Sequence, residues 1–223
     1  LGIAVLNTPA AATEAVADLT LAFILQLLRP IPRLADEYRR GRFAQVRAQP
    51  HGCELNTLTV GIVGMGRIGS AVGRRCAAGF GTHVLYNDIV PVGPFDFPAQ
   101  PVDKPTIWSQ CDIVTLHVPL TDLTRGLISA ELLARFRPGA LLINTARGAV
   151  VDTAALVAAL QAGSLGGAAL DVTDPEPLPP DHPLFACDRC ILTPHIAART
   201  VGGLKRMAAV VDDVLAHLRS SRA

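Results

Sequence analysis

The sequence predicts an α/β fold with a Rossmann-type, doubly wound parallel sheet. Between residues 59 and 193, short apolar strands alternate with helical segments, which is the pattern of consecutive βαβ units. Half of the 223 residues are hydrophobic but only 4% are aromatic, so Ala, Val, Leu and Ile must fill the core. A glycine-rich turn follows the first strand of the alternating region. Together these observations favour one sheet between two layers of helices.

The first element is a helix over residues 14–28, with Thr13 as its cap and Arg29-Pro30 at its end. It is apolar on nearly every face, which indicates that it lies between two bodies. The later strands are expected at 59–63, 83–88, 113–118, 140–144, 168–172 and 191–193, and the later helices at 67–78, 129–136, 152–162 and 199–219. The Pro-rich segment 89–105 has no periodicity and is expected to be a loop or a much-reduced crossover.

Charge and composition exclude several classes of partner. The net charge of +1 gives no electrostatic attraction to nucleic acid or to an anionic membrane. The longest uncharged apolar stretch, between Asp18 and Arg29, is too short to span a bilayer. We therefore expect no nucleic-acid and no membrane partner.

The five cysteines favour a cytoplasmic protein with reduced thiols, because an odd number is not a disulfide framework. Cys187 and Cys190 form a C-x-x-C pair, but no second pair and no histidine at zinc spacing accompanies them. We expect these cysteines to be structural and expect no metal site.

The segment Gly64-Met-Gly-Arg-Ile-Gly69 matches the G-x-G-x-x-G pattern of dinucleotide-binding turns. It follows a strand and opens a helix, which is the context that the pattern requires. Gly64 permits the tight turn, Gly66 lets a pyrophosphate approach the backbone, and Gly69 allows close packing of helix on strand. The phosphates would then meet the free N–H groups at the helix N-terminus.

Asp88 ends the next strand, 19 residues after Gly69, close to the spacing of about 20 that this fold uses. A carboxylate here accepts hydrogen bonds from the ribose hydroxyls of NAD. It would repel the 2′-phosphate of NADP, and no Arg or Lys follows directly to offset that repulsion. The predicted cofactor is therefore NAD.

Three polar residues follow later strands, and the carboxyl ends of parallel strands meet at the edge where such sheets bind ligands. They are Arg147, Glu176 and His195. Taken singly, the arginine could cap a helix, the glutamate could be a solvated loop residue, and the histidine could belong to the core. A cation, an acid and a histidine at one edge are a candidate catalytic group.

The sequence resembles the D-isomer-specific 2-hydroxyacid dehydrogenase family over nearly its whole length. Six blocks in the family's order carry the resemblance. They are Gly2-Ile-Ala-Val-Leu-Asn-Thr-Pro9, Gly61-Ile-Val-Gly-Met-Gly-Arg-Ile-Gly69, Leu116-His-Val-Pro-Leu-Thr121, Gly139-Ala-Leu-Leu-Ile-Asn-Thr-Ala-Arg-Gly148, Gly167-Ala-Ala-Leu-Asp-Val172 and Thr193-Pro-His-Ile-Ala197.

The resemblance assigns roles to the matching residues. It implies that Arg147 binds a small 2-oxo or 2-hydroxy acid, that His195 is the acid/base, and that Glu176 pairs with it. It also implies a set of cofactor-binding residues. These are Gly64, Gly66, Arg67, Ile68, Gly69, Asp88, Val118, Pro119, Thr124, Thr145, Ala146, Arg147, Asp171, His195 and Ala197. The family blocks place His117 and Asp112 at a strand, so both are expected to be structural.

The same resemblance predicts the domain organisation. Residues 10–197 are expected to form the NAD-binding domain, while 1–9 and 198–223 are expected to be remnants of a flavodoxin-like substrate domain whose other residues precede this chain in family members. A homodimer is expected, because the helix over residues 14–28 is apolar on too many faces to be exposed to solvent, and relatives dimerise through this part of the cofactor domain.

Two alternatives to an active dehydrogenase stay open. One is a non-catalytic NAD-binding fragment. The other is an NAD-sensing corepressor-like protein, although such proteins usually carry Trp just after the histidine block, where this chain has Ile196-Ala-Ala-Arg-Thr200. Formate dehydrogenases share the fold but carry Gln in place of Glu176.

Overall fold

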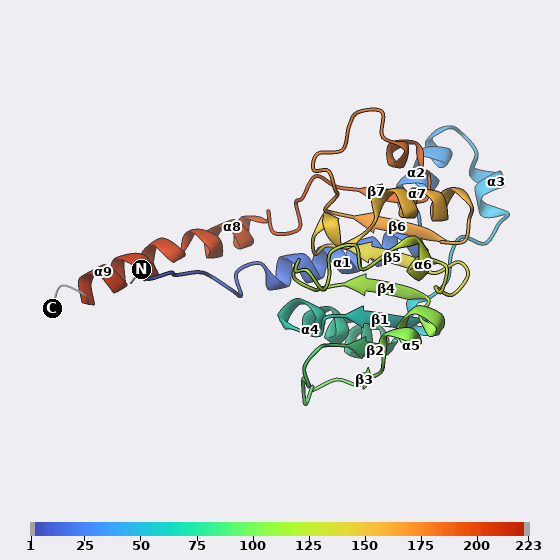
Figure 1. Cartoon of the computed structure of the whole chain (residues 1–223). Helices are drawn as coiled ribbons and strands as arrows, with labels where there is room; N and C mark the ends of the chain where they lie inside the picture. Colours follow the sequence, from blue (N-terminus) through green and yellow to red (C-terminus); the bar gives the residue numbers. More distant parts are fainter. Residues whose placement is uncertain (1–2, 221–223) are drawn as a thin grey trace.

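The computed structural model describes residues 3–220, so residues 1–2 and 221–223 of the predicted substrate-domain segments lie outside the described residues. Parallel strands form one seven-stranded sheet in the order β3-β2-β1-β4-β5-β6-β7 (Figure 1). The strands are β1 (Thr59–Val63), β2 (His83–Asn87), β3 (Gln100–Pro101), β4 (Ile113–Leu116), β5 (Leu141–Asn144), β6 (Gly167–Leu170) and β7 (Cys190–Leu192). The chain runs outward from β1 to β3 and returns to β4 on the other side of β1. The predicted Rossmann-type sheet is confirmed.

Helices cover both faces of this sheet. The α-helices within the described residues are α1 (Thr13–Leu28), α2 (Ile31–Arg39), α3 (Phe43–Arg47), α4 (Arg67–Arg74), α5 (Lys104–Gln110), α6 (Ala130–Leu133), α7 (Thr153–Gln161), α8 (Val201–Ala208) and α9 (Val210–Ser220). Buried side chains of α1 and α4 pack on one face of the sheet. Those of α5, α6 and α7 pack on the other face, as a doubly wound fold requires.

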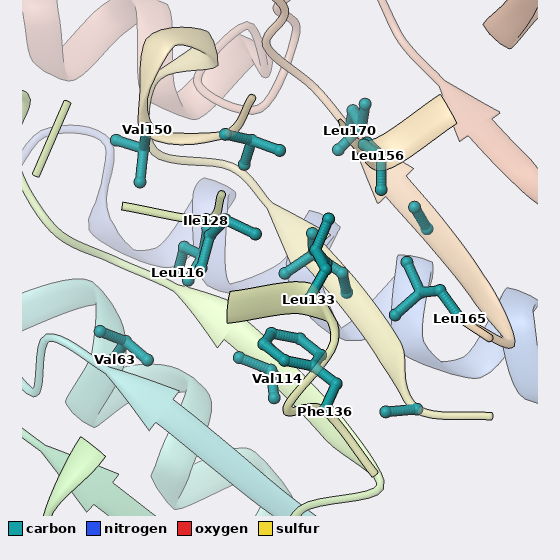
Figure 2. Packing of buried hydrophobic residues seen from close by; sticks show 14 of the residues in the cluster. Val63, Val114, Leu116, Ile128, Leu133, Phe136, Val150, Leu156, Leu165 and Leu170 are labelled. Atoms are coloured by element: carbon teal, nitrogen blue, oxygen red, sulfur yellow. The ribbon is translucent and has the colours of Figure 1, made fainter. Parts of the chain in front are cut away.

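Successive residues of a strand point to opposite faces, so each central strand supplies both cores. In β4, Ile113 packs on the side of α1 and α4, whereas Val114 and Leu116 pack on the side of α5–α7. Figure 2 shows the second cluster, where Ile128 and Phe136 lie over β4. Each such buried side chain stabilises the fold by roughly 1.5–3 kcal/mol relative to exposure. The edge that carries the polar residues therefore rests on a firmly packed layer.

The segment 89–105 has no helix or strand over most of its length, as predicted, but its end contains a short strand and the start of a helix. β3 pairs in parallel with β2 through Gln100 and Pro101, and α5 begins at Lys104. The Asp103 side chain caps this helix by accepting a hydrogen bond from the Thr106 N–H at 2.9 Å. A two-residue strand and a short helix with a proline in its first turn give too little periodicity to be recognised in the sequence.

Several helix boundaries also differ from the prediction. Thr13 is the first residue of α1 and not its N-cap. The N-cap position is Ala12, whose side chain cannot accept a hydrogen bond from the helix. The predicted helix over 67–78 ends as α4 at Arg74 and continues as a π-helical turn over Arg75–Gly79. The expected final helix is divided into α8 and α9, and α8 begins only after its cap, Thr200.

Besides α5, two further helices were not predicted. α2 and α3 contain no buried residue, and they lie beyond the end of the sheet opposite to α8 (Figure 1). We call residues 31–47 the arm. Within residues 3–220, no single helix is both long and apolar enough to cross a membrane, and α1 and α2 reach that hydropathy only as a pair, bent by 52°.

The helix α1 lies along the sheet, packed against α4 and against β5 and β6. Its seven buried residues include Phe23 and Ile24. Its remaining surface is not wholly apolar, because Glu14 and Asp18 both pair with Arg75, at 2.6 Å and 2.8 Å. The helix thus forms part of the core that positions the sheet.

Candidate active site

The predicted site residues gather at the carboxyl edge of the sheet. The glycine turn follows β1, Asp88 follows β2, and Arg147 follows β5, while Glu176 and His195 follow β6 and β7. The crevice opens between β1 and β4, where the order of the strands reverses.

The glycine turn has the geometry of a dinucleotide-binding turn. Gly64 has a φ of 92°, which favours glycine, and a Cβ there would lie 2.5 Å from the His117 carbonyl oxygen. A Cβ on Gly69 would lie 2.1 Å from the carbonyl oxygen of Gly64, so only glycine lets α4 pack this closely. At Gly66, by contrast, no other residue lies within 4 Å of a Cβ position. The backbone of Gly66 is therefore open to a ligand, which fits the close approach of a pyrophosphate.

Asp88 braces this turn. Its Oδ2 accepts a hydrogen bond from the Met65 N–H at 2.7 Å, and its Oδ1 accepts a longer one from the Val90 N–H at 3.3 Å. The carboxylate therefore stands directly beside the backbone that would face the phosphates. Any phosphate added to the ribose near Asp88 would meet a fixed negative charge.

A cavity of about 370 Å³ lies beside the turn. Its lining joins four segments that are far apart in the sequence. The lining residues are Pro9, Ala12, Thr13, Gly66, Arg67, Ile68, His117, Val118, Pro119, Thr145, Ala146 and Arg147. Backbone groups at a helix start, two arginines and apolar walls match the needs of a dinucleotide, so the residues present fit NAD.

The turn that carries Arg147 is held by Asn144, the last residue of β5. The Asn144 amide donates to the Arg147 carbonyl oxygen at 2.9 Å and accepts from the Ala146 N–H at 3.0 Å. Gly148 follows, and a Cβ there would lie 1.9 Å from the carbonyl oxygen of Thr173 in the loop after β6. The two loops are therefore interlocked. Sequence reasoning missed both supports, although a polar residue ending a buried strand was a usable signal for Asn144.

Glu176 and His195 form an ion pair, with 2.7 Å between Oε1 and Nδ1. Because a carboxylate only accepts hydrogen bonds, Nδ1 carries the proton and Nε2 faces outward for chemistry. The hydrogen bond from His195 holds the pKa of Glu176 below its ordinary value, helped by the Thr173 N–H and by the positive charge of Arg147. About half of each side chain is exposed, at 49% for the histidine and 43% for the glutamate.

Asp171, the residue after β6, fixes the backbone of the histidine loop. This carboxylate is 1% exposed and accepts hydrogen bonds from the Thr193 hydroxyl at 2.5 Å and from the Ile196 and Ala197 N–H groups at 2.8 Å each. His195 itself has a φ of 53°, an uncommon value for a residue other than glycine. Asp171 thus holds the loop in a conformation that presents the imidazole.

A second cavity, of about 420 Å³, is lined by the Glu176–His195 pair. Apart from the pair itself and Asp171, its walls are largely apolar. They comprise Thr173, Pro177, Leu178, Phe185, Leu192, Thr193 and Pro194.

Some predicted residues lie outside these cavities. Thr124 does not line either one, and its hydroxyl donates to the Pro119 carbonyl oxygen at 2.6 Å, so it shapes the loop after β4. Asp112 accepts from the Thr59 N–H at 2.8 Å and pairs with Arg137, at the amino edge of the sheet. His117 bonds to Thr115 at 3.0 Å, and burial lowers its pKa to about 3, so it is a neutral wall residue.

Comparison with known proteins identifies the family. Residues 21–197 match the model of the D-isomer specific 2-hydroxyacid dehydrogenase NAD binding domain. The chain belongs to this family. The predicted family and the NAD cofactor are thereby confirmed.

Individual members of the family are similar to this chain. A glyoxylate reductase from Thermofilum pendens is 43% identical over 217 residues, which cover 93% of this chain but 62% of that protein. The crystal structure of TT0316 protein from Thermus thermophilus has a TM-score of 0.87 and 43% identity, covering 98% of this chain and 70% of that one. A D-lactate dehydrogenase from Aquifex aeolicus, complexed with NAD and lactic acid, has a TM-score of 0.84 and 34% identity, covering 95% and 68%. The chain thus spans less than two thirds of the length of the Thermofilum relative.

Proposed function

We propose that this chain is part of an NAD-dependent D-2-hydroxyacid dehydrogenase, which interconverts a D-2-hydroxy acid and its 2-oxo acid. The observation that carries the proposal is the Glu176–His195 pair, 2.7 Å apart, at the same sheet edge as Arg147 and the glycine turn. The similarity to a glyoxylate reductase and to a D-lactate dehydrogenase agrees with this class of substrate.

The residues divide the work as follows. The glycine turn would hold NAD together with Val118 and Ala146, which line the adjacent cavity. The bound cofactor would supply or accept the hydride. Arg147 binds the carboxylate of the acid through a charge-assisted fork. His195 donates a proton from Nε2 to the substrate carbonyl oxygen during reduction and removes it during oxidation. Glu176 keeps the imidazole oriented and stabilises its protonated form.

Activity measurements test this function. The protein is assayed for NADH oxidation with glyoxylate, hydroxypyruvate, pyruvate, phenylpyruvate and 3-phosphohydroxypyruvate. His195→Asn should lower kcat/KM by about 10²- to 10⁴-fold, because general acid catalysis is lost. His83→Asn is the matched control, since His83 is exposed at the amino edge of the sheet. Both variants should bind NADH as well as the unsubstituted protein does.

The result also distinguishes the alternative functions. A full-length protein that binds NADH but reduces none of the five acids would support a non-catalytic NAD-binding or NAD-sensing protein. Equal activity of His195→Asn and His83→Asn would show that His195 takes no part in the proton transfer.

The same proposal includes the domain organisation, a homodimer and a cytoplasmic location. Residues 10–197 would form the NAD-binding domain, and the described parts of 1–9 and 198–223 would belong to the substrate domain. In support, the N-terminal segment and α8–α9 extend together from the end of the sheet (Figure 1). Arg206 of α8 donates to the Ala11 carbonyl oxygen at 2.9 Å, and Val5 and Val201 expose 84% and 74% of their surface there.

A further inference from the structure

The C-x-x-C segment, which the proposed function does not use, forms a tight turn just before β7. The Cys190 N–H donates to the Cys187 carbonyl oxygen at 2.9 Å, the i to i+3 bond of a β-turn. Such a turn brings its first and fourth Cα atoms within about 7 Å. A disulfide requires a Cα separation of about 4.4–6.8 Å. The turn therefore brings the two residues close to the separation that a disulfide requires, and the remaining approach must come from movement of the backbone.

Both thiols are available for chemistry. Cys187 and Cys190 are free and only partly buried, whereas Cys76 and Cys111 are fully buried. Their inner sides pack against the same apolar cluster as Leu192. Two free thiols at the ends of one turn, next to solvent, distinguish this pair from the other cysteines.

We propose that Cys187 and Cys190 are a thiol-modification site, which closes reversibly to a disulfide by exchange with a low-molecular-weight disulfide. The Cys187 thiolate attacks one sulfur of the small disulfide, forming a mixed disulfide and releasing one thiolate. Cys190 then loses its proton to solvent and attacks the Cys187 sulfur, releasing the second thiolate. The protein dithiol is oxidised by two electrons, and the small disulfide is reduced to two thiols.

The surroundings set the order of these steps. Burial, together with the neighbouring Cys187, raises the pKa of the Cys190 thiol to about 12. Cys190 is therefore a poor first nucleophile, and Cys187 is the attacking residue. Once Cys187 is modified, the turn holds Cys190 beside it, which favours closure over a second mixed disulfide.

The two ends of the turn differ in how firmly they are held. Cys190 is paired with Ala168 in the sheet, and the Ala168 N–H donates to the Arg189 carbonyl oxygen at 2.9 Å. Cys187 instead follows the short 3-10 turn Pro183–Ala186. Closing the disulfide should therefore displace the 3-10 turn and leave β7 in place.

The displaced turn carries Phe185, which is 58% exposed and lines the cavity that also contains Glu176 and His195. Oxidation should then reshape the wall of the candidate substrate site without touching the glycine turn. This consequence rests on the proposed function, whereas disulfide formation itself does not.

Trypsin offers a direct test on the native protein, because Arg189 lies between the two cysteines. The protein is incubated with glutathione disulfide, its free thiols are blocked by alkylation, and it is digested. The expected product is peptide 148–189 joined by a disulfide to peptide 190–199, which separates on reduction. Separate peptides with both cysteines alkylated, or a link from either one to a different cysteine, would overturn the proposal.

Two variants test the order of attack. Cys190→Ser should stop at a mixed disulfide on Cys187, whereas Cys187→Ser should leave Cys190 unmodified. Cys53→Ser is the matched control, since Cys53 is also partly exposed, and it should form the linked peptides as the native protein does. A mixed disulfide on Cys190 in Cys187→Ser, at the rate seen for Cys187, would contradict the assignment.

The effect on the site is measured separately. The KM for the preferred 2-oxo acid should rise several-fold in the oxidised protein, while the Kd for NADH stays unchanged and reduction restores the first value. A protein that forms the linked peptides but is inactive in both states would refute the proposed function and leave the modification site standing. Linked peptides with an unchanged KM would overturn only the coupling to Phe185.

Discussion

Two carboxylates act on one histidine, and their environments separate their tasks. Asp171 is buried, and its three hydrogen bonds go to the residues around the imidazole rather than to the ring. Glu176 is partly exposed and binds the ring itself. The short side chain of Asp171 holds the loop on either side of His195, whereas the longer side chain of Glu176 reaches Nδ1 of the ring. The two carboxylates could not exchange these roles unless His195 moved.

Glu176→Gln should move the basic limb of the pH profile for 2-oxo acid reduction to lower pH, by about one unit or more. Glutamine retains an acceptor oxygen for Nδ1 but has no charge to stabilise the imidazolium. The pKa of Glu176 is lowered from 4.5, so the native carboxylate is ionised across the neutral range. The carboxylate gains a proton only as pH falls through that lowered value, well away from the basic limb, where the imidazolium loses its proton.

The measurement is kcat/KM for reduction between pH 5 and pH 10. Glu131→Gln, on the exposed surface of α6, is the matched control and should leave the profile in place. An unmoved basic limb in Glu176→Gln would separate this glutamate from the proton transfer.

Asp88 should make NAD(H) the preferred cofactor over NADP(H) by roughly 30- to 1000-fold in Kd, since two like charges near 4 Å cost roughly 2–4 kcal/mol at an effective dielectric of 20 or more. Asp88→Asn keeps an oxygen for the Met65 N–H but removes the charge, so the preference should shrink. Fluorescence titration of both reduced cofactors measures it. Equal affinities in the unsubstituted protein would refute the assignment of Asp88.

At the scale of elements, the loops after β5 and β6 operate as one unit, because Gly148 lies against the backbone of Thr173. That backbone also supports Glu176, since the Thr173 N–H donates to Glu176 Oε2 at 3.3 Å. Asp174 is tied back to α7 by the Thr153 hydroxyl, at 2.8 Å. The position of Arg147 relative to Glu176 is therefore set by contact between the two loops.

Gly148→Ala should lower kcat/KM by about 10²-fold, because a methyl group 1.9 Å from the Thr173 carbonyl oxygen must displace a loop, and misplacement by about 1 Å has that cost. The affinity for NADH should change little, since the glycine turn is untouched. Gly79→Ala is the control, because no other residue lies within 4 Å of its Cβ position. Steady-state kinetics measures kcat/KM and titration measures the Kd for NADH in both variants. An unchanged kcat/KM in Gly148→Ala would contradict the prediction.

The elements that could be predicted from the sequence are those with strong local signals. β1 was predicted at its observed bounds, because its apolar run is followed at once by glycine. β3 was not, since two residues such as Gln100 and Pro101 become a strand only by pairing with β2. For the candidate site too, some residues could be singled out from the sequence and others could not. Residues with distinctive chemistry, such as His195, could be found, whereas Asn144 and Gly148 act through contacts between loops that no local pattern encodes.

At the scale of the whole molecule, the arm is the part that is least stabilised by packing against its own chain. α2 has nine residues and α3 has five, and neither buries a side chain. Isolated helices shorter than about 12 residues are marginal in water. Exposed ion pairs such as Arg39–Asp36 add little stability. An arm of this kind is expected to be held by a partner.

The sequence placed the homodimer contact at the helix 14–28, but α1 packs against α4, β5 and β6 of its own chain. We therefore place the contact at the arm, where Ile31, Tyr38 and Phe43 are 68%, 62% and 55% exposed. The rings of Tyr38 and Phe43 lie 5.6 Å apart and present one apolar surface.

Sedimentation at micromolar concentration should show a dimer, and Phe43→Asp should dissociate it. Val211→Asp, an equally exposed position on α9, should leave the dimer intact, and each chain should still bind NADH because the arm is remote from the glycine turn. A monomeric unsubstituted protein, or a dimer broken by Val211→Asp and not by Phe43→Asp, would place the subunit contact elsewhere.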